Sequence, residues 1–269
     1  MENNQNTKKS WGGNWSAVTA DNAIVNFPPY IPNPNAPPGL VQIEYLTKRY
    51  GSFVALADVT VQFPRGKVIG LLGPNGSGKT TLIKLLTNLL MQYDGTILID
   101  GKKPGQETKK IVSYLPDRNY LPDNWSTKHA INYFKDFYPD FDADKAHRLM
   151  GDLFIDTDKR FKTLSKGTKE KVQLVLVLSR QAQLYIFDEP IAGVDPAARD
   201  YIFRMIYNNC SRESSVIIST HLVSEAETIF DHAVFLKQGR IVLAGEADDI
   251  RKHYARSLND LFREVYRYA

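Results

Sequence analysis

The 269-residue sequence holds a single cysteine, Cys210, so no disulfide bond can form within the chain. It also lacks long apolar runs. Stretches such as Val68–Leu72 and Val172–Leu178 fall far short of the roughly 20 residues that a membrane-spanning helix needs. The first residues have no apolar run behind a basic cluster, which argues against a secretory signal. These absences indicate a protein of the cytoplasm that crosses no membrane.

Long blocks of one charge are missing as well. The 34 Lys and Arg residues and the 30 Asp and Glu residues are spread along the chain, for a formal net charge of +4. This small positive excess suits a nucleotide anion and gives little support to nucleic acid as a partner. The hydrophobic fraction of 43% is enough for a sizeable core.

Residues 1–40 form a stretch rich in Pro and Asn, with six prolines between positions 28 and 38. Such a composition disfavours a regular helix and predicts a loosely attached tail. A second possibility, an arm that packs on the domain or on a partner, stays open because the stretch contains Trp11, Trp15, Phe27 and Tyr30. The rest is interpreted as a domain over 41–255 and a helical extension over 256–269.

From Val41 onward, short apolar strands alternate with segments of helical spacing. Buried strands are predicted at 68–72, 184–187 and 216–218, and a helix is predicted at 81–90. Apolar strands separated by helices predict an α/β fold with a mostly parallel sheet covered on both faces. Near the end, two apolar segments flank Lys237-Gln238-Gly239 and predict a β-hairpin.

A glycine-rich segment lies between the first of these strands and the helix, and it fits the phosphate-binding P-loop pattern: Gly73-Pro74-Asn75-Gly76-Ser77-Gly78-Lys79-Thr80, followed by Thr81. The glycines let backbone N–H groups surround phosphates, and the helix adds the positive end of its dipole. Lys79 is expected to reach the outer phosphates and Thr80 to bind Mg²⁺. A chance glycine-rich turn would rarely fall at such a junction, so the pattern predicts a nucleotide site.

Two adjacent carboxylates follow the predicted strand at 184–187. Asp188, at the mouth of a parallel sheet, can hold Mg²⁺ directly or through water, and Glu189 can polarise an attacking water molecule. Alone, such a pair would more often start a loop or cap a helix. Beside a P-loop it indicates metal-assisted hydrolysis of a phosphate bond.

With these motifs in this order, the sequence resembles the ATP-binding subunits of ABC transporters over about residues 41–254. The resemblance implies a P-loop NTPase core with a mostly parallel sheet, an N-terminal antiparallel β portion and a helical subdomain at about 118–180. It also implies binding and hydrolysis of ATP with Mg²⁺. Glu189, His221 and Lys79 are then the catalytic residues, and His221 matches the switch histidine that contacts the γ-phosphate and orients water.

The same resemblance suggests further contacts with the nucleotide. Tyr50 matches the aromatic residue that stacks on adenine, with a core tyrosine as the alternative. Ser165 and Gly167, in Leu164-Ser165-Lys166-Gly167-Thr168, match the signature that faces the ATP of the opposite protomer. Asp195 matches the loop that links the two sites of the dimer, and is otherwise a turn residue.

Two positions depart from the family pattern. Asp117 follows Tyr114-Leu115-Pro116, where the family usually has a glutamine that binds Mg²⁺ or water. An aspartate can still bind the metal, but its charge near triphosphate predicts a sharper dependence of hydrolysis on Mg²⁺. Lys166 and Thr168 alter the signature, and Lys166 either adds positive charge near the opposite ATP or is solvated.

A mostly helical insertion between positions 118 and 163 is rich in aromatic residues. In the family this subdomain forms the groove for a short cytoplasmic helix of the membrane protein. Core packing is expected to explain most of these side chains, and an exposed subset is expected to mark the docking surface. The residues concerned are Tyr120, Trp125, Tyr133, Phe134, Phe137, Tyr138 and Phe141.

The resemblance implies the ATPase subunit of an exporter, similar to those of small bacterial systems that include peptide-antibiotic resistance. A permease on a separate chain would move the substrate, and a second copy or a related ATPase subunit would complete the dimer at the inner face of the cell membrane. Two alternatives stay open. One is a soluble ABC ATPase acting on ribosomes or DNA, although the chain has neither tandem cassettes nor a coiled-coil insertion. The other is a module that closes on ATP with little hydrolysis, against which Glu189 and His221 argue. No nucleic-acid partner is expected.

Overall fold

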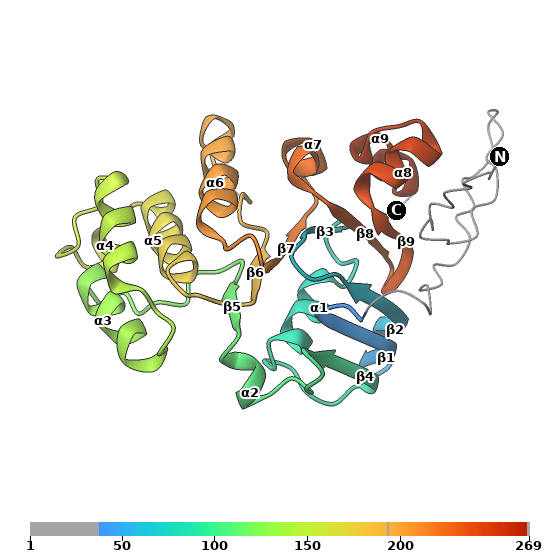
Figure 1. Ribbon diagram of the computed structural model, residues 1–269, viewed down its shortest axis with the longest axis horizontal. Helices are drawn as coiled ribbons and strands as arrows, with labels where there is room; N and C mark the ends of the chain where they lie inside the picture. Colours follow the sequence, from blue (N-terminus) through green and yellow to red (C-terminus); the bar gives the residue numbers. More distant parts are fainter. Residues whose placement is uncertain (1–37, 193, 268–269) are drawn as a thin grey trace, which may run out of the picture.

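The computed structural model describes residues 38–192 and 194–267, and most of the stretch predicted as a tail lies outside them. Figure 1 shows helices α3, α4 and α5 grouped at one end of the molecule and the strands β1, β2 and β4 at the other. A central sheet runs between the two groups, and β1, β2 and β4 form a second sheet of their own.

The central sheet has six strands in the order β5-β6-β7-β3-β8-β9. Five of them are parallel and the last pairs antiparallel with β8, which confirms the predicted α/β class, the mostly parallel sheet and the hairpin. The strands are β3 (Val68–Leu72), β5 (Val112–Leu115), β6 (Leu184–Asp188), β7 (Ser215–Thr220), β8 (His232–Lys237) and β9 (Arg240–Glu246).

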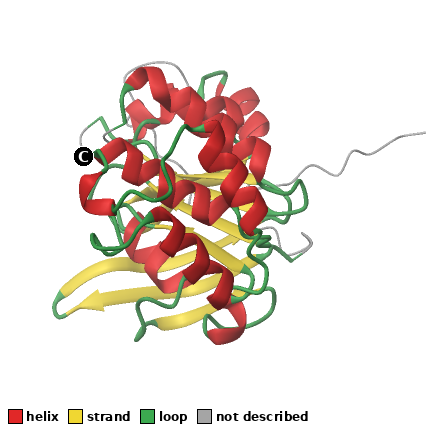
Figure 2. Ribbon diagram, turned by 90° about the vertical axis from the view of Figure 1, so that its left-hand side faces the viewer, coloured by secondary structure: helices red, strands yellow, loops and turns green. Residues whose placement is uncertain are grey.

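The side chains of these strands alternate between two hydrophobic cores, because successive residues of a strand point to opposite faces. On β6, Leu184 and Ile186 belong to the core shared with the second sheet and α1. Tyr185 and Phe187 belong to the core shared with the larger group of helices. Helices lie on both sides of the central strands in Figure 2. Burial of both faces explains why the strands read as continuous apolar runs.

A second, antiparallel sheet precedes and flanks the first helix, as the resemblance implied. It contains β1 (Val41–Tyr50), β2 (Phe53–Phe63) and β4 (Asp94–Ile99), in the order β2-β1-β4. Its inward side chains, including Ile43 and Val61, pack in the core that also holds residues of α1.

Helix α1 (Lys79–Leu86) differs from the helix predicted at 81–90. It starts two residues earlier, directly after the P-loop glycine, and it ends at Leu86 with Thr87 as C-cap. Asn88 has a φ of +55°, a left-handed conformation that cannot continue a helix. The apolar residues after Leu86 continue the helical spacing in the sequence, but they are not part of the helix. One of them, Leu89, is exposed.

Three helices stand between β5 and β6 in the sequence, within the segment 118–180 predicted as a helical subdomain: α3 (Thr127–Phe137), α4 (Ala143–Asp152) and α5 (Lys166–Leu178). Each begins with a polar N-cap whose side chain accepts a hydrogen bond from a backbone N–H of the first turn. These caps are Ser126, Asp142 and Ser165.

Of the remaining helices, the last four lie along one side of the central sheet in Figure 1, and the short helix that precedes β5 lies on the opposite side. They are α2 (Gln106–Lys109), α6 (Pro196–Asn209), α7 (Val223–Ala226), α8 (Ala247–Tyr254) and α9 (Leu258–Val265), with 3₁₀ turns at Phe161–Thr163 and Glu227–Ile229. Helix α9 lies in the predicted extension at 256–269. Within the described ranges, no helix combines the length and apolarity that crossing a membrane would require.

Candidate nucleotide-binding site

A pocket of about 300 Å³ lies beside the segment that fits the P-loop pattern. Its walls come from the β1–β2 hairpin, from the P-loop and the start of α1, and from the residues that follow β5 and β6. The structure thus gathers predicted site residues from distant parts of the chain. The described lining residues are Tyr50, Phe53, Ala55, Asn75, Gly76, Gly78, Lys79, Thr80, Thr81, Asp117 and Glu189.

The P-loop glycines meet different geometric demands. Gly78 is the N-cap of α1 at a φ of 110°, and no side chain caps the helix there. A Cβ atom at Gly73 would lie 2.5 Å from the Leu236 carbonyl oxygen, whereas one at Gly76 would meet nothing within 4 Å. The loop is therefore packed tightly at its start and open at its tip, and the first turn of α1 presents its backbone N–H groups without a side-chain cap, as an anion site requires.

The turn of the β8–β9 hairpin supports the loop from behind. The Gly239 N–H donates to the Ser77 carbonyl oxygen at 2.9 Å, and the Gly239 carbonyl accepts from the Ala57 N–H at the same distance. Gly239 has a φ of +76°, and a Cβ atom there would lie 2.6 Å from the Ala55 carbonyl oxygen. The sequence predicted this turn but gave no sign that it contacts the P-loop.

The end of the chain also contacts the strand that leads into the loop. The Tyr266 hydroxyl, just after α9, lies 3.0 Å from the Leu236 carbonyl oxygen and 3.2 Å from that of Leu72, the residue before Gly73. Lys237 donates to the Val265 carbonyl at 2.6 Å. Burial raises the pKa of Tyr266, so its hydroxyl stays protonated and can donate to one of these carbonyls at a time.

Lys79, Glu189 and His221 form a connected group. The Lys79 ammonium is almost fully buried, donates to the Gly73 carbonyl at 2.6 Å and lies 3.1 Å from Glu189 Oε1. The other carboxylate oxygen, Oε2, lies 2.9 Å from His221 Nδ1. Glu189 holds this position with a φ of +51°, a conformation that is strained for a residue with a side chain. The carboxylate is thus placed between a cation and an imidazole.

Asp188 lies at the end of β6 and is completely buried. Its Oδ1 accepts a hydrogen bond from Ser219 Oγ at 2.6 Å and a longer one from Thr80 Oγ1 at 3.4 Å. Its Oδ2 is buried and has no partner among the described residues. Burial raises the pKa of Asp188, and the two hydroxyls act in the opposite direction. A cation at Oδ2 would satisfy the open acceptor and favour the charged carboxylate.

Asp117 lies at the rim of the same pocket, with a side chain that is 40% exposed and 3.9 Å from Arg118 Nε. Across the described parts of the chain, no group of three or more His, Cys, Asp or Glu side chains could hold a metal ion by itself. A cation at this site would therefore complete its coordination with phosphate oxygens and water, which is how Mg²⁺ is usually bound.

The signature residues lie apart from this pocket. Ser165 is the N-cap of α5 and accepts from the Thr168 N–H at 3.2 Å. A Cβ atom at Gly167 would meet nothing within 4 Å, and Lys166 is exposed and 4.0 Å from Glu170. None of the described residues that line the nucleotide pocket comes from this segment. Asp195 is also exposed, directly before α6, and Gly193, two positions earlier, lies outside the described residues.

The aromatic residues of the helical subdomain divide into a buried and an exposed group. Phe134 and Phe141 are in the core, and Trp125 and Tyr138 pack against it. Tyr120, Tyr133 and Phe137 are exposed. The rings of Trp125, Tyr133 and Phe137 follow one another, with centroid distances of 4.8 Å and 4.3 Å. Two rings of this row, Tyr133 and Phe137, belong to the exposed subset that the sequence could not single out, whereas Trp125 is half-buried beside them.

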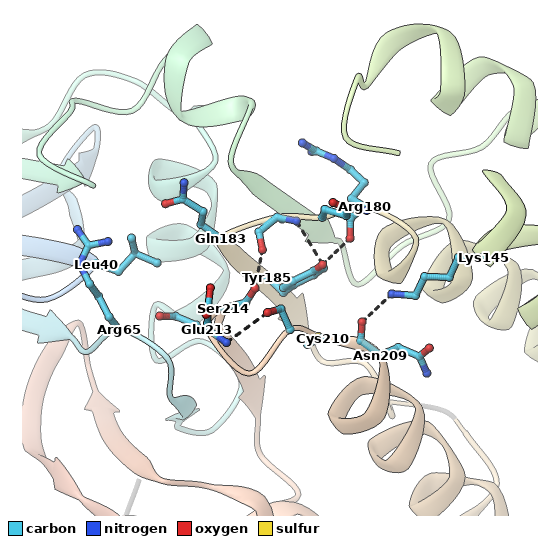
Figure 3. Close-up of a pocket in the computed structure, with 14 residues that line it drawn as sticks. Leu40, Arg65, Lys145, Arg180, Gln183, Tyr185, Asn209, Cys210, Glu213 and Ser214 are labelled. Carbon is cyan, nitrogen blue, oxygen red and sulfur yellow. Dashed lines mark hydrogen bonds between the residues drawn. The ribbon is translucent and has the colours of Figure 1, made fainter. Parts of the chain in front are cut away.

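A larger cavity of about 620 Å³ opens at the amino ends of β6 and β7 (Figure 3). The basic side chains Lys145 and Arg180 that line it already have partners within the protein. Lys145 donates to the carbonyls of Leu178 at 2.6 Å and Asn209 at 2.7 Å. Arg180 forms an ion pair with Asp140 at 3.0 Å. The side chains of this cavity therefore join α4, α5 and α6, and the arrangement is a structural one.

Comparisons with known proteins find similarity to ATP-binding proteins of ABC transporters. The family model described as ABC transporter matches residues 56–192. The chain is 30% identical over 220 residues to the ABC transporter ATP-binding protein YtrB of Bacillus subtilis (strain 168), covering 81% of this chain and 75% of YtrB. It is 28% identical over 209 residues to the SkfA peptide export ATP-binding protein SkfE of the same organism, covering 76% of this chain and 87% of SkfE.

A solved structure of an ATP-binding subunit of an ABC transporter is similar as well. It superimposes with a TM-score of 0.76 and 29% sequence identity, and the match covers 84% of this chain and 99% of the other. The described fold therefore has a counterpart among known structures.

Proposed function

The chain belongs to the ABC transporter family as an ATP-binding, ATP-hydrolysing subunit, and we propose that it powers export through a separate membrane protein. The meeting of Lys79, Glu189 and His221 beside the P-loop is the observation that carries the proposal. The family's name places such subunits at a membrane, and a relative named for peptide export supports the direction of transport. The chain would lie at the cytoplasmic face, where ATP is supplied.

In the proposed mechanism, the phosphates of ATP take the place of Glu189 at the Lys79 ammonium. The N–H groups of the P-loop and of the first turn of α1 hold the same phosphates. Glu189 is then released from its cation and stays hydrogen-bonded to His221, so it can accept a proton from the attacking water. The imidazole of His221 would fix the direction of the carboxylate, and we propose that it also contacts the γ-phosphate.

The residues present fit Mg²⁺. We assign it to the Thr80 hydroxyl and the buried Asp188 carboxylate, whose Oδ2 has no partner in the described structure, with Asp117 at the rim. When bound, the metal would neutralise charge on the phosphate oxygens. Thr80 and Asp188 are already oriented toward each other, so little rearrangement of these side chains is needed.

The distance between the signature and the pocket supports a composite site. Ser165 and Gly167 lie on an exposed surface of the helical subdomain, outside the pocket that contains the P-loop. We propose that they contact ATP held by a second ATPase subunit, either another copy of this chain or a related one. The open surface at Gly167 allows a phosphate to approach the start of α5, and Asp195 would line the joint between the two subunits.

The row of Trp125, Tyr133 and Phe137 is the proposed docking surface for the membrane subunit. Tyr133 and Phe137 are exposed and stacked on each other beside the half-buried Trp125, and exposed aromatic rings are costly in water and enriched at protein interfaces. The two other functions considered for the sequence receive less support, since the relatives are named for transport and the geometry keeps a base beside the phosphate site.

The direction of transport can be tested with membrane vesicles that contain the chain and its membrane partner. Inside-out vesicles are expected to accumulate a fluorescent peptide antibiotic when ATP and Mg²⁺ are added outside, because their cytoplasmic face is exposed. Right-side-out vesicles should not respond, and vesicles with the Glu189→Gln variant serve as the inactive control. Uptake by right-side-out vesicles loaded with ATP would contradict export.

The role of Asp117 predicts a change in metal dependence. Without Mg²⁺ its carboxylate repels the triphosphate, so Asp117→Gln is expected to tighten ATP binding in EDTA by about two- to fivefold, a small effect because the side chain is partly exposed. The rate of ATP hydrolysis by this variant should then depend less steeply on the Mg²⁺ concentration. Titration of binding and of phosphate release measures both, with the exposed Asp136→Asn as the control. Unchanged Mg²⁺ dependence would count against this role.

A further inference from the structure

The aromatic part of the nucleotide pocket contains a second ring, Phe53, which the motifs did not reveal beside Tyr50. Tyr50 and Phe53 stand directly opposite each other on β1 and β2, joined by the two-residue turn Gly51–Ser52. Directly paired residues of an antiparallel ladder carry their side chains on the same face, about 5 Å apart at the Cβ atoms. Both side chains line the pocket, together with Ala55, two residues further along β2.

The opposite part of the pocket is polar. Lys79 and Thr80 lie there, with the carboxylates of Glu189 and Asp117. A ligand that fills the whole pocket must therefore combine a flat apolar group with a polyanion. A nucleoside triphosphate has this division, and the aromatic part is the place for its base.

Tyr50 alone gives the base limited contact. The Lys48 ammonium lies 5.2 Å from the centroid of the Tyr50 ring, so one face of this ring is already covered. Lys48 is fixed there because it donates to the carbonyls of Met91 at 2.9 Å and Gln92 at 2.7 Å. The base can stack on the other face only, and more apolar surface must come from a neighbour.

We propose that Phe53 is a second contact for the nucleotide base, which it holds together with Tyr50 at the aromatic end of the pocket. Phe53 is 63% exposed although it is a large apolar residue at the rim of a ligand pocket, so covering it by a base removes apolar surface from water. This inference rests on the proposed binding of ATP in this pocket, and it adds a residue that sets the affinity for the base.

The test compares two ligands, ATP and inorganic tripolyphosphate, by isothermal titration with the full-length protein. Phe53→Ala is expected to weaken ATP binding by about tenfold, in the range seen when a stacking side chain is removed. Tripolyphosphate has no base, so its Kd should stay the same. Phe53→Tyr keeps the ring and should bind ATP like the wild type, while Phe53→Leu keeps apolar surface without the ring and should fall between the wild type and Phe53→Ala.

Matched variants separate this role from a structural one. Phe154→Ala removes a phenylalanine that is 96% exposed and outside the pocket lining, and should change neither Kd. Tyr50→Ala should weaken ATP but not tripolyphosphate. Unchanged ATP affinity in Phe53→Ala overturns the inference, and so does an equal loss for both ligands, which would mean that Phe53 supports the P-loop. If the wild type binds ATP no better than tripolyphosphate, the pocket holds no base and the inference fails together with the role of Tyr50.

Discussion

Replacing Glu189 with glutamine is expected to lower ATP hydrolysis by about 10²- to 10⁴-fold, the usual contribution of a positioned general base. The structure adds an expectation about binding. Glu189 Oε1 lies 3.1 Å from the Lys79 ammonium, and both side chains are nearly buried, so the carboxylate competes with the phosphates for this cation. The neutral amide competes less. ATP should therefore bind about fivefold more tightly, which corresponds to roughly 1 kcal/mol.

Steady-state phosphate release and the Kd of a fluorescent ATP analogue measure the two effects separately. Glu107→Gln changes an exposed glutamate of α2 in the same way and serves as the control. A Glu189→Gln variant that hydrolyses ATP at the wild-type rate would remove Glu189 from the proposed mechanism. Slower hydrolysis combined with weaker ATP binding would show that the carboxylate does not compete for Lys79.

Replacing Arg180 with alanine is expected to destabilise the protein by about 3 kcal/mol, because it removes a buried guanidinium and leaves a half-buried carboxylate and two backbone carbonyls without their partner. The guanidinium is almost fully buried beside the cavity in Figure 3. It binds the Asp140 carboxylate, donates to the carbonyls of Lys110 at 2.8 Å and Val112 at 2.7 Å, and lies 4.0 Å above the Tyr138 ring. One side chain thus joins the helical subdomain to β5.

Urea unfolding followed by circular dichroism measures this change in the free energy of unfolding. Arg180→Lys keeps the charge but not the planar fork of donors, so it should recover only part of the stability. Arg148→Ala, an exposed arginine on α4, should stay within about 0.5 kcal/mol of the wild type. An unfolding midpoint of Arg180→Ala equal to that of Arg148→Ala would contradict a joining role for Arg180.

The P-loop and the buried strands could be predicted from the sequence because each depends on residues that are close together in the chain. The glycines of the P-loop need conformations or close contacts that other residues do not tolerate, and this demand is visible in the sequence itself. The buried strands were visible because both faces of the central sheet are covered. The end of α1 was placed four residues too late, since apolar spacing continued after the left-handed Asn88 had ended the helix.

Contacts between segments that are distant in the chain could not be predicted from the sequence alone. Lys79 follows β3 and Glu189 follows β6. These two strands lie on either side of β7, so their ends bring the two side chains together, and the sequence does not state this strand order. The support of Ser77 by Gly239 depends in the same way on β3 and β8 being neighbours in the sheet. Exposure is also a property of the whole fold, which is why Phe134 and Phe137 look alike in the sequence and differ in the structure.

The contact of Tyr266 with the strand before the P-loop offers a position for a spectroscopic label. The natural thiol, Cys210, is partly buried, and burial raises its pKa to about 12, so it reacts slowly with alkylating reagents near neutral pH. A cysteine introduced by Arg267→Cys would carry the fluorophore next to Tyr266, whose hydroxyl reaches the Leu72 carbonyl. The dye would then follow movements of the nucleotide loop in real time without a change to any residue that contacts ATP.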